Sequence, residues 1–277
     1  MINLVFGVPH EISDYLLSRE EVKKVSFTGS VPVGKLLARK SAETLKRCTL
    51  ELGGHSPAII AEDADIETTL DTLTGFKFRN AGQVCIAPSR FYVHESIYDE
   101  VRDGFLNRIK KINLGNGLNE GVTMGPLSNS RRVDAMKDFI DDAVKNGSNL
   151  IHGGNKHKDK GFFWEPTLIE NINEEAKMMT EEIFGPILAL FKFTDYDDVI
   201  EKANSLNYGL ASYVYTTSKA LQEKMAREII AGGVSINTAS PMHPEIPYGG
   251  IKESGIGYEG GIDAIYSFLH KKNVNIV

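Results

Sequence analysis

Apolar and polar positions along the chain follow two different periods. Short apolar runs, typical of buried parallel strands, are separated by longer stretches in which apolar residues recur every three or four positions, as on one face of a helix. The apolar runs predict strands over residues 22–28, 49–52, 57–61, 90–94, 187–193, 212–216 and 234–237. The helical stretches predict helices over residues 32–45, 97–112, 131–146 and 219–230. This alternation predicts an α/β fold with parallel strands.

The beginning of the chain also carries an apolar run. Residues 2–8 are apolar enough to predict a buried strand, and Gly7 and Pro9 interrupt the run too early for a membrane span or a signal peptide. A short helix is predicted over residues 13–19. We therefore expect the first elements of this chain to be strands and helices from the middle of a doubly wound sheet. A sheet of so few strands is expected to have one edge and one face that another element must cover.

Composition limits the class of protein and its partners. The chain has 277 residues, of which 42% are hydrophobic and 25% are charged, which is typical of a globular protein with one large or two ordinary domains. A net charge of -6 gives no general attraction to a phosphate backbone, so nucleic acid is not an expected partner. Cys48 and Cys85 are too few for a disulfide framework or a four-thiolate zinc site. We therefore expect a cytoplasmic protein with no metal site and no membrane segment.

A glycine and a serine stand between a predicted strand and a predicted helix. Gly29 and Ser30 come shortly before Pro32, a residue favoured in the first turn of a helix. Backbone N–H groups at such a junction bind phosphate groups. The pattern nearly matches the loop of nucleoside triphosphatases, but Leu36 occupies the position of the magnesium-binding hydroxyl, which argues against that class. A dinucleotide site and a plain tight turn both stay open.

Glu51 and Cys85 are candidates for catalysis. Glu51 lies between two leucines at the end of a strand, where burial raises the pKa of a carboxyl toward that of a general base; a structural acid with a charged partner is the alternative. Cys85 follows a helix predicted to end near Gly82, so its thiol can face a ligand from a loop; an inert, buried cysteine is the alternative. Cys48 fits the inert role, and His55 fits a hydrogen-bonded turn.

Five motifs occur in a fixed order along the chain. They are FTGS at 27–30, LELGGHSP at 50–57, FRNAGQVC at 78–85, EEIFGP at 181–186 and PYGGIKESGIG at 247–257. Their order and approximate spacing resemble the aldehyde dehydrogenase superfamily, and most of all its succinate-semialdehyde dehydrogenase branch. The resemblance extends from residue 2 to the C-terminus. It implies an α/β fold with a three-layer catalytic domain and an incomplete doubly wound cofactor-binding domain.

The resemblance also implies a domain organisation and an assembly. A partial dinucleotide-binding domain is expected over residues 1–53, a catalytic domain over 54–253, and a C-terminal return segment with an oligomerisation strand over 254–277. Residues 272–277, apolar at alternate positions, are similar to the family's intersubunit strand. A homo-oligomer, either a dimer or a tetramer, is therefore expected.

The family's chemistry is carried over onto matching residues. By resemblance, Cys85 is the nucleophile that adds to an aldehyde, and its backbone N–H is one donor to the resulting oxyanion. Hydride transfer to NAD or NADP then leaves a thioester, and Glu51 activates the water that hydrolyses it. The positions that resemble cofactor contacts are Gly29 and Ser30 at the pyrophosphate, Glu182 at the nicotinamide ribose and Phe184 beside the nicotinamide.

The residues before the nucleophile limit the class of substrate. Phe78 and Arg79 resemble the succinate-semialdehyde branch, in which the arginine binds the distal carboxylate of the substrate through its planar fork. An arginine that pairs with a nearby acid of the protein is the alternative. A serine that assists in that branch is missing here, because its place falls at Met242 or His243. Other semialdehydes and hydroxyaldehydes therefore stay open.

The resemblance has one large gap. Typical members have a long N-terminal part before the position at which Ile2 aligns, and it carries an asparagine that donates to the oxyanion and a lysine that contacts the adenosine ribose. We therefore expect weak binding of NAD(P) and little dehydrogenase activity from this chain alone. Two alternatives to a dehydrogenase follow: an impaired remnant that only oligomerises, and a weak thiol esterase that uses Cys85 and Glu51 without hydride transfer.

Overall fold

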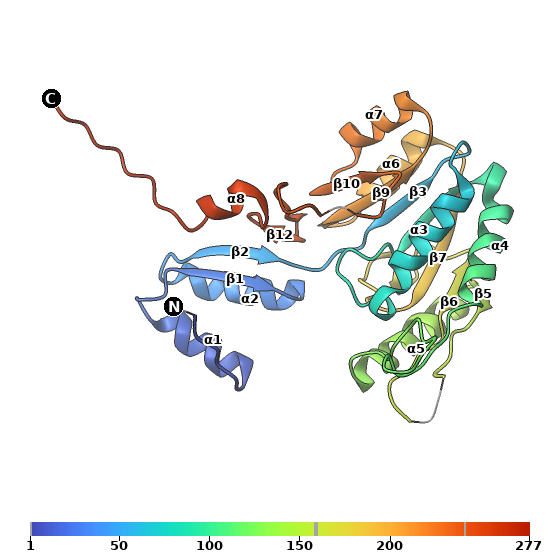
Figure 1. The fold of residues 1–277 in the computed structure, drawn as a ribbon, viewed down its shortest axis with the longest axis horizontal. Coiled ribbons are helices and arrows are strands. Elements are labelled where there is room, and N and C mark those ends of the chain that lie inside the picture. The colour runs from blue at the N-terminus through green and yellow to red at the C-terminus, as the bar shows by residue number, and fades with distance from the viewer. Residues whose placement is uncertain (1, 158–159, 241) are drawn as a thin grey trace.

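The computed structural model describes residues 2–157, 160–240 and 242–277 (Figure 1). Within these ranges seven strands form the larger sheet, in the order β10-β9-β3-β4-β7-β6-β5. Neighbouring strands run parallel except β5, which is antiparallel to β6. The strands are β3 (Pro57–Ile60), β4 (Arg90–His94), β5 (Asn149–His152), β6 (Thr167–Glu170), β7 (Ile187–Phe193), β9 (Ala211–Tyr215) and β10 (Gly233–Ile236).

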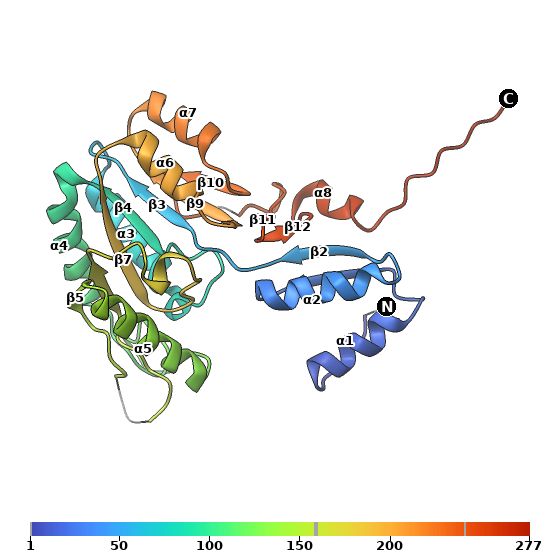
Figure 2. The same ribbon diagram turned by 180° about the vertical axis from the view of Figure 1, so that it is seen from behind.

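Helices cover both faces of the larger sheet (Figures 1 and 2). One face carries α3 (Ile66–Phe78), α4 (Tyr98–Ile109) and α5 (Ser130–Lys145), and the other carries α6 (Tyr196–Asn204) and α7 (Lys219–Glu228). Because side chains of a strand alternate between faces, Phe91 packs into the larger core under α3 and α4, whereas its neighbour Tyr92 packs with the residues of α6 and α7. The result is the three-layer arrangement that the sequence predicts.

A smaller sheet lies beside the first. Its strands β1 (Lys24–Thr28) and β2 (Arg47–Glu51) are parallel, and β12 (Gly255–Ile256) pairs antiparallel with β2. Helix α2 (Val31–Ala42) lies along this sheet, and α1 (Pro9–Ser18) lies against α2 (Figure 1). The remaining elements are the paired strands β8 (Tyr208–Gly209) and β11 (Ile251–Lys252), helix α8 (Gly261–Tyr266) and the 3-10 turns η1 (Arg79–Gly82), η2 (Glu95–Ile97) and η3 (Lys177–Met179).

Ser254 connects the segment between β2 and β3 with strand β8. The Ser254 hydroxyl donates to the Gly53 carbonyl at 2.8 Å and accepts the Gly209 N–H at 2.9 Å. The Leu52 N–H donates to the Ser254 carbonyl at 2.9 Å. Because Ser254 is completely buried, these bonds fix the segment that follows Glu51. The predicted division at residues 53 and 253 stays a prediction, and β12 shows that the last segment contributes to the smaller sheet.

One strand prediction is wrong. Residues 2–8 form no strand, and the side chains of Ile2 and Phe6 are 98% and 87% exposed. This run is apolar, but a strand also needs a neighbour with which to exchange backbone hydrogen bonds. Residues 272–277 pair with no described strand of this chain, so their role as an oligomerisation strand stays a prediction. The glycine- and lysine-rich residues 153–161 are typical of a surface loop, and residues 158 and 159 of this stretch lie outside the described part of the chain. No helix in the described part of the chain has the length and apolar character needed to span a membrane.

Candidate functional site

A cavity of about 490 Å³ collects residues from several distant parts of the chain. Thr28, Gly29 and Ser30 come from the turn between β1 and α2, and Glu51 comes from the end of β2. The other walls are Leu52, Gly53, Gln83, Val84, Cys85, Arg132, Glu182 and Phe184. Six of the eight residues singled out from the sequence therefore line one cavity.

The loop that carries Cys85 has an unusual backbone. Asn80, Ala81 and Gly82 have φ angles of 50°, 52° and 72°, so three successive residues lie in the left-handed region. Gly82 is required there, because a Cβ would lie 2.2 Å from the Gly185 carbonyl oxygen. The Gln83 side chain closes the turn by donating to the Asn80 carbonyl at 3.0 Å. This turn ends α3 and places Cys85 at the cavity wall.

The Cys85 thiol is protonated in this site at neutral pH. Burial raises its pKa to about 11, and the charges of Glu51 and Glu182 act in the same direction. The backbone N–H groups of Cys85 and Ile86 act in the opposite direction, since they stabilise the thiolate. A nucleophilic attack by this sulfur therefore requires that its proton pass to a base at the same time.

Glu51 has the properties of such a base. Glu51 is 4% exposed, and its Oε1 atom is buried without a hydrogen-bond partner among the described residues. Burial raises its pKa to about 7, and the negative charge of Glu259 adds to the effect. A carboxyl with this pKa is partly ionised at neutral pH and accepts a proton far more readily than an exposed glutamate does.

Glu182 lies across the cavity against the glycines that follow Glu51. The Gly54 N–H donates to Glu182 Oε1 at 3.2 Å, and a Cβ on Gly53 would lie 2.5 Å from Oε2. Burial raises the pKa of Glu182, while the Gly54 N–H and the positive charge of Arg132 lower it. The carboxylate is thus held in place and still has acceptor capacity toward the cavity.

Arg132 is a cavity residue that sequence reasoning missed. Its Nη2 donates to the carbonyl oxygens of Ile183 and Phe184, the latter at 3.2 Å, and the guanidinium lies 5.9 Å from the centroid of the Phe184 ring. Phe184 itself has a φ of 45°. Arg132 therefore stabilises the strained turn that presents Phe184 to the cavity. It begins α5, far from every motif, so no local signal marks it.

Gly29 and Ser30 lie where a phosphate group would meet the start of a helix. Ser30 precedes the first residue of α2, and its side chain makes no capping bond. The first N–H groups of this helix therefore lack a side-chain acceptor, as in helix N-termini that bind phosphate groups.

Phe78 and Arg79 lie outside this cavity. Phe78 is 4% exposed and belongs to the main core, so its side chain serves packing. Arg79 is exposed and lines a separate surface groove together with Asp71, Phe76 and residues 238–240. Its guanidinium makes no ion pair with any described residue. The alternative of a structural Arg79 paired with an acid of the protein therefore finds no support.

His55 is the hydrogen-bonded turn residue predicted from the sequence. Its ring nitrogens lie 2.7 Å from Ser89 Oγ and 2.9 Å from the Met178 carbonyl oxygen. Burial and the nearby Arg90 lower its pKa to about 3, so the ring is neutral at physiological pH. Both ring nitrogens of His55 are hydrogen-bonded to other groups of the protein, so His55 has no part in proton transfer.

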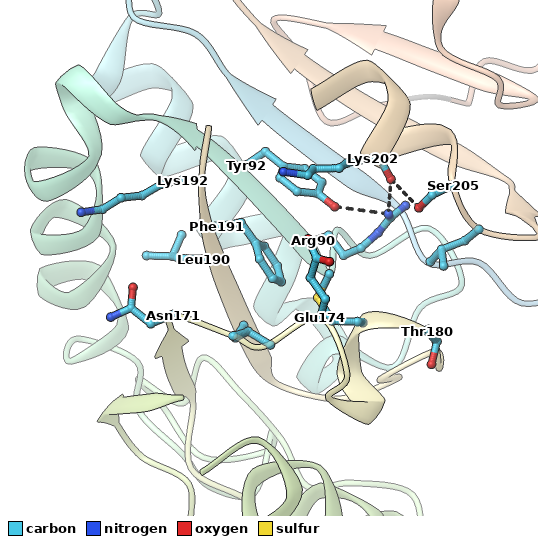
Figure 3. Close-up of a pocket in the computed structure, with 13 residues that line it drawn as sticks. Arg90, Tyr92, Asn171, Glu174, Thr180, Leu190, Phe191, Lys192, Lys202 and Ser205 are labelled. Carbon is cyan, nitrogen blue, oxygen red and sulfur yellow. Dashed lines mark hydrogen bonds between the residues drawn. The ribbon is translucent and has the colours of Figure 1, made fainter. Parts of the chain in front are cut away.

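A second cavity, of about 430 Å³, surrounds Arg90 on the side of the larger sheet where α6 lies (Figure 3). The Arg90 guanidinium donates to the Lys202 carbonyl at 2.8 Å and to the Ala203 carbonyl at 3.1 Å. It also donates twice to the His55 carbonyl. All of these bonds go to backbone carbonyls, so the Arg90 guanidinium stabilises the surrounding backbone. None of the residues singled out from the sequence lines this cavity.

Comparisons with known proteins agree with the geometry of the Cys85 cavity. The model of the aldehyde dehydrogenase family matches residues 1–274. The chain belongs to the aldehyde dehydrogenase family. Because the motifs around Glu51, Cys85 and Glu182 all lie inside this match, the family resemblance proposed from five short motifs is confirmed over nearly the whole chain.

The chain is similar in sequence to curated aldehyde dehydrogenases. It is 40% identical over 272 residues to a succinate semialdehyde dehydrogenase of Acinetobacter baylyi, covering 98% of this chain and 56% of the relative. It is 38% identical over 274 residues to a 3-sulfolactaldehyde dehydrogenase of Pseudomonas putida, covering 99% of this chain and 56% of the relative.

A solved structure confirms the fold. The crystal structure of an Escherichia coli NADP-dependent enzyme matches with a TM-score of 0.94 at 37% identity, covering 96% of this chain and 55% of that one. The predicted α/β architecture is therefore that of an aldehyde dehydrogenase. In all three comparisons the chain spans about half the length of the protein that it matches.

Proposed function

We propose that this chain carries the acyl-transfer chemistry of an NAD(P)-dependent oxidation of an aldehyde to a carboxylate. The observation that supports this most strongly is the convergence of Cys85, Glu51 and Glu182 in one cavity, together with the turn at Gly29 and Ser30. A nucleophile, a base with a pKa of about 7 and a helix N-terminus are the parts that such a reaction needs.

The first step forms a bond between Cys85 Sγ and the aldehyde carbon. The thiol proton passes to a base, for which Glu51, a buried carboxyl in the same cavity, is a candidate, and negative charge develops on the aldehyde oxygen. The Cys85 backbone N–H is a donor to that oxygen. Glu51 then releases that proton to solvent and is ionised again. Once the carbon is oxidised to a thioester, a water molecule gives a proton to Glu51 and attacks the carbonyl carbon. The C–S bond then breaks and releases the carboxylate.

The cavity residues fit the nicotinamide end of a dinucleotide. Glu182 offers carboxylate oxygens to ribose hydroxyls, Phe184 offers an apolar face, and the N-terminus of α2 offers N–H groups to a phosphate. Gly53 has no side chain to fill the space beside Glu182. When bound, NAD or NADP supplies the hydride acceptor. The residues of this chain would hold its reactive end and do not decide between the two cofactors.

The substrate proposed is an aldehyde with an anionic group at its far end. Arg79 is exposed in its groove and lacks an acidic partner among the described residues, so it is available to an anion. The names of the two relatives given above denote aldehydes that carry a carboxylate and a sulfonate. A semialdehyde such as succinate semialdehyde is therefore the first substrate to test.

Assembly and location are part of the same proposal. Residues 272–277 extend from the fold as an exposed segment at the end of the chain (Figure 1). An exposed, β-prone segment of this kind favours pairing with a second copy of the chain, as a dimer or a tetramer. Both cysteines are free, which suits the reducing cytoplasm.

A thiol esterase is the second candidate, because Cys85 and Glu51 supply acylation and deacylation within this chain. The two candidates, and an inactive remnant, are separated by measuring NAD(P)H formation from succinate semialdehyde and hydrolysis of p-nitrophenyl acetate on the same sample. NAD(P)H formation supports the dehydrogenase, ester hydrolysis alone supports the esterase, and neither supports the remnant.

The role of Cys85 is tested by comparing the two cysteines. We expect Cys85→Ala to abolish both activities, since no other residue in the cavity is a comparable nucleophile. Cys48→Ala is the matched control, because Cys48 is also a free, half-buried thiol, but it lies in β2 outside the cavity. Ester hydrolysis that survives Cys85→Ala would contradict the proposal.

A further inference from the structure

Strand β1 lies at the open edge of the smaller sheet. The strand order of this sheet is β1-β2-β12, so β1 pairs with β2 on one side and with no described strand on the other. The Arg47 N–H donates to the Lys23 carbonyl at 3.2 Å, and the Gly29 N–H donates to the Glu51 carbonyl at 3.0 Å. Because backbone groups along a strand point to alternate sides, the odd-numbered residues of β1 bond to β2. The residues whose N–H and C=O groups face the open edge are therefore Lys24, Ser26 and Thr28.

The backbone groups at this edge have no partner in the described part of the chain. The N–H and C=O groups of Ser26 and Thr28 enter no turn, loop or cap hydrogen bond there, and both residues are exposed. Parallel strands normally lie inside larger sheets, and β1 and β2 are a parallel pair. A row of unpaired donors and acceptors on such a strand is a template for a further strand.

The part of the chain before β1 also exposes apolar side chains. In the run that precedes α1, Leu4 and Phe6 are 80% and 87% exposed. In α1 itself Tyr15 is 65% exposed, and α2 lies between α1 and the strands of the smaller sheet (Figure 1). The larger sheet, in contrast, has helices on both faces (Figures 1 and 2). The open backbone edge and this uncovered apolar surface thus belong to the same part of the fold.

The relatives indicate what kind of polypeptide fits this surface. The match to the Acinetobacter baylyi enzyme covers 98% of this chain and 56% of the relative, and the match to the Escherichia coli crystal structure covers 55% of that structure. A relative therefore contains a further part that needs a surface of this same fold to pack against. An unpaired parallel strand beside exposed apolar residues is such a surface.

We propose that the open edge of β1 binds a parallel strand of a second polypeptide, which carries the part of an aldehyde dehydrogenase that this chain does not match. The strand exchanges backbone hydrogen bonds with Lys24, Ser26 and Thr28, and apolar side chains of the same polypeptide cover α1 and residues 2–6. In strand addition of this kind, backbone bonds give affinity and side chains set the register. The contact does not depend on the proposed acyl-transfer chemistry.

The test co-produces this chain with the part of the Acinetobacter baylyi enzyme that lies outside the match, so that the two polypeptides fold together. We expect them to elute as a 1:1 complex in size-exclusion chromatography with light scattering. Amide hydrogen exchange, measured by NMR, then compares the complex with this chain alone. The Ser26 and Thr28 amides should exchange at least about tenfold more slowly in the complex, whereas the Phe27 amide, bonded to β2, should be protected in both.

A proline at residue 26 tests the edge itself. Ser26→Pro removes an N–H that β2 does not use, and edge strands tolerate proline. We expect it to weaken the complex at least about tenfold, because a backbone hydrogen bond is lost and the ring hinders close approach of the strand. Ser26→Ala is the matched control, since it keeps the N–H, and its affinity should equal that of the wild type. Urea unfolding of the free chains measures whether either variant is destabilised.

Several outcomes would overturn the inference. The two polypeptides might be recovered separately, or their complex might leave the Ser26 and Thr28 amides unprotected; either result rules out strand addition at β1. Equal affinities of Ser26→Pro and Ser26→Ala would do the same. If Ser26→Pro lowers the urea midpoint, the exchange rates of the wild-type amides decide alone. Protection of these amides in this chain alone, rising with its concentration, would show that a second copy occupies the edge instead.

Discussion

At the scale of single residues, burial disfavours the charged forms of the Cys85 thiol and the Glu51 carboxyl. Burial raises the pKa values of both Cys85 and Glu51, so neither group carries a full charge before the reaction begins. The sequence predicts the effect on Glu51 from the two leucines that flank it. It does not predict that the Cys85 thiol is held protonated, because the two opposing carboxylates come from other parts of the chain.

Arg79 is the residue on which the proposed substrate class depends. We expect Arg79→Leu to lower kcat/KM for succinate semialdehyde about fivefold, because a pair between an exposed arginine and a carboxylate contributes up to about 1 kcal/mol. An uncharged aldehyde such as propanal should be oxidised at nearly the wild-type efficiency. Equal losses on the two substrates would mean that Arg79 only maintains the fold.

At the scale of elements, the turn between α3 and Cys85 is the most constrained part of the site. We expect Gly82→Ala to destabilise the fold by at least about 2 kcal/mol. Residue 82 has a left-handed φ, and the Cβ of an alanine there would overlap the Gly185 carbonyl. Urea unfolding at fixed pH measures the effect.

Gly75 in α3 provides the matched control for that substitution. It lies in the same helix, and a Cβ there would meet no atom within 4 Å. Gly75→Ala should therefore stabilise the protein by about 0.5–1 kcal/mol through helix propensity. If the two alanine variants unfold at the same urea concentration, the turn does not impose the strain argued here.

The elements also show what can be predicted from sequence. Strands β4 and β7 agree with their predictions to the residue, because each is an apolar run with polar or turn residues at its ends. Strands β5 and β6 were not predicted, since each has only two apolar residues between polar ones, with the sequences NLIH and TLIE. Residues 2–8 have the same apolar pattern as a true strand, but they pair with no strand in the part of the chain that the structure describes.

The site was predictable where residues belong to a motif and not where they depend on packing alone. Glu51, Cys85 and Glu182 were singled out because family motifs surround them, and the structure brings them into one cavity. Arg132 meets Phe184 only through the packing of α5, which no local pattern encodes. Phe78 shows the converse limit, because its motif position does not place its side chain in the cavity.

At the scale of the whole molecule, the cavity lies between the end of the smaller sheet and the loops that lead into the larger one. Glu182 is the proposed contact at the nicotinamide end, and the chain spans about half the length of the relatives that it matches. We expect NAD(P) to bind with a dissociation constant of about 1 mM or weaker, and Glu182→Ala to weaken it further. Calorimetric titration of the purified chain measures both values. Micromolar binding would show that this chain completes a cofactor site by another route.

The central claim, that Cys85 is acylated and Glu51 then activates water, is tested most directly by intact-protein mass spectrometry after mixing with p-nitrophenyl acetate. In the wild type, the acetyl adduct on Cys85 should disappear faster as the pH rises through about 7, because Glu51 accepts a proton only when ionised. In Glu51→Gln, one acetyl group per chain should accumulate on Cys85 and persist at every pH. An adduct on another residue, or a Glu51→Gln adduct that is lost at the wild-type rate, would contradict the account.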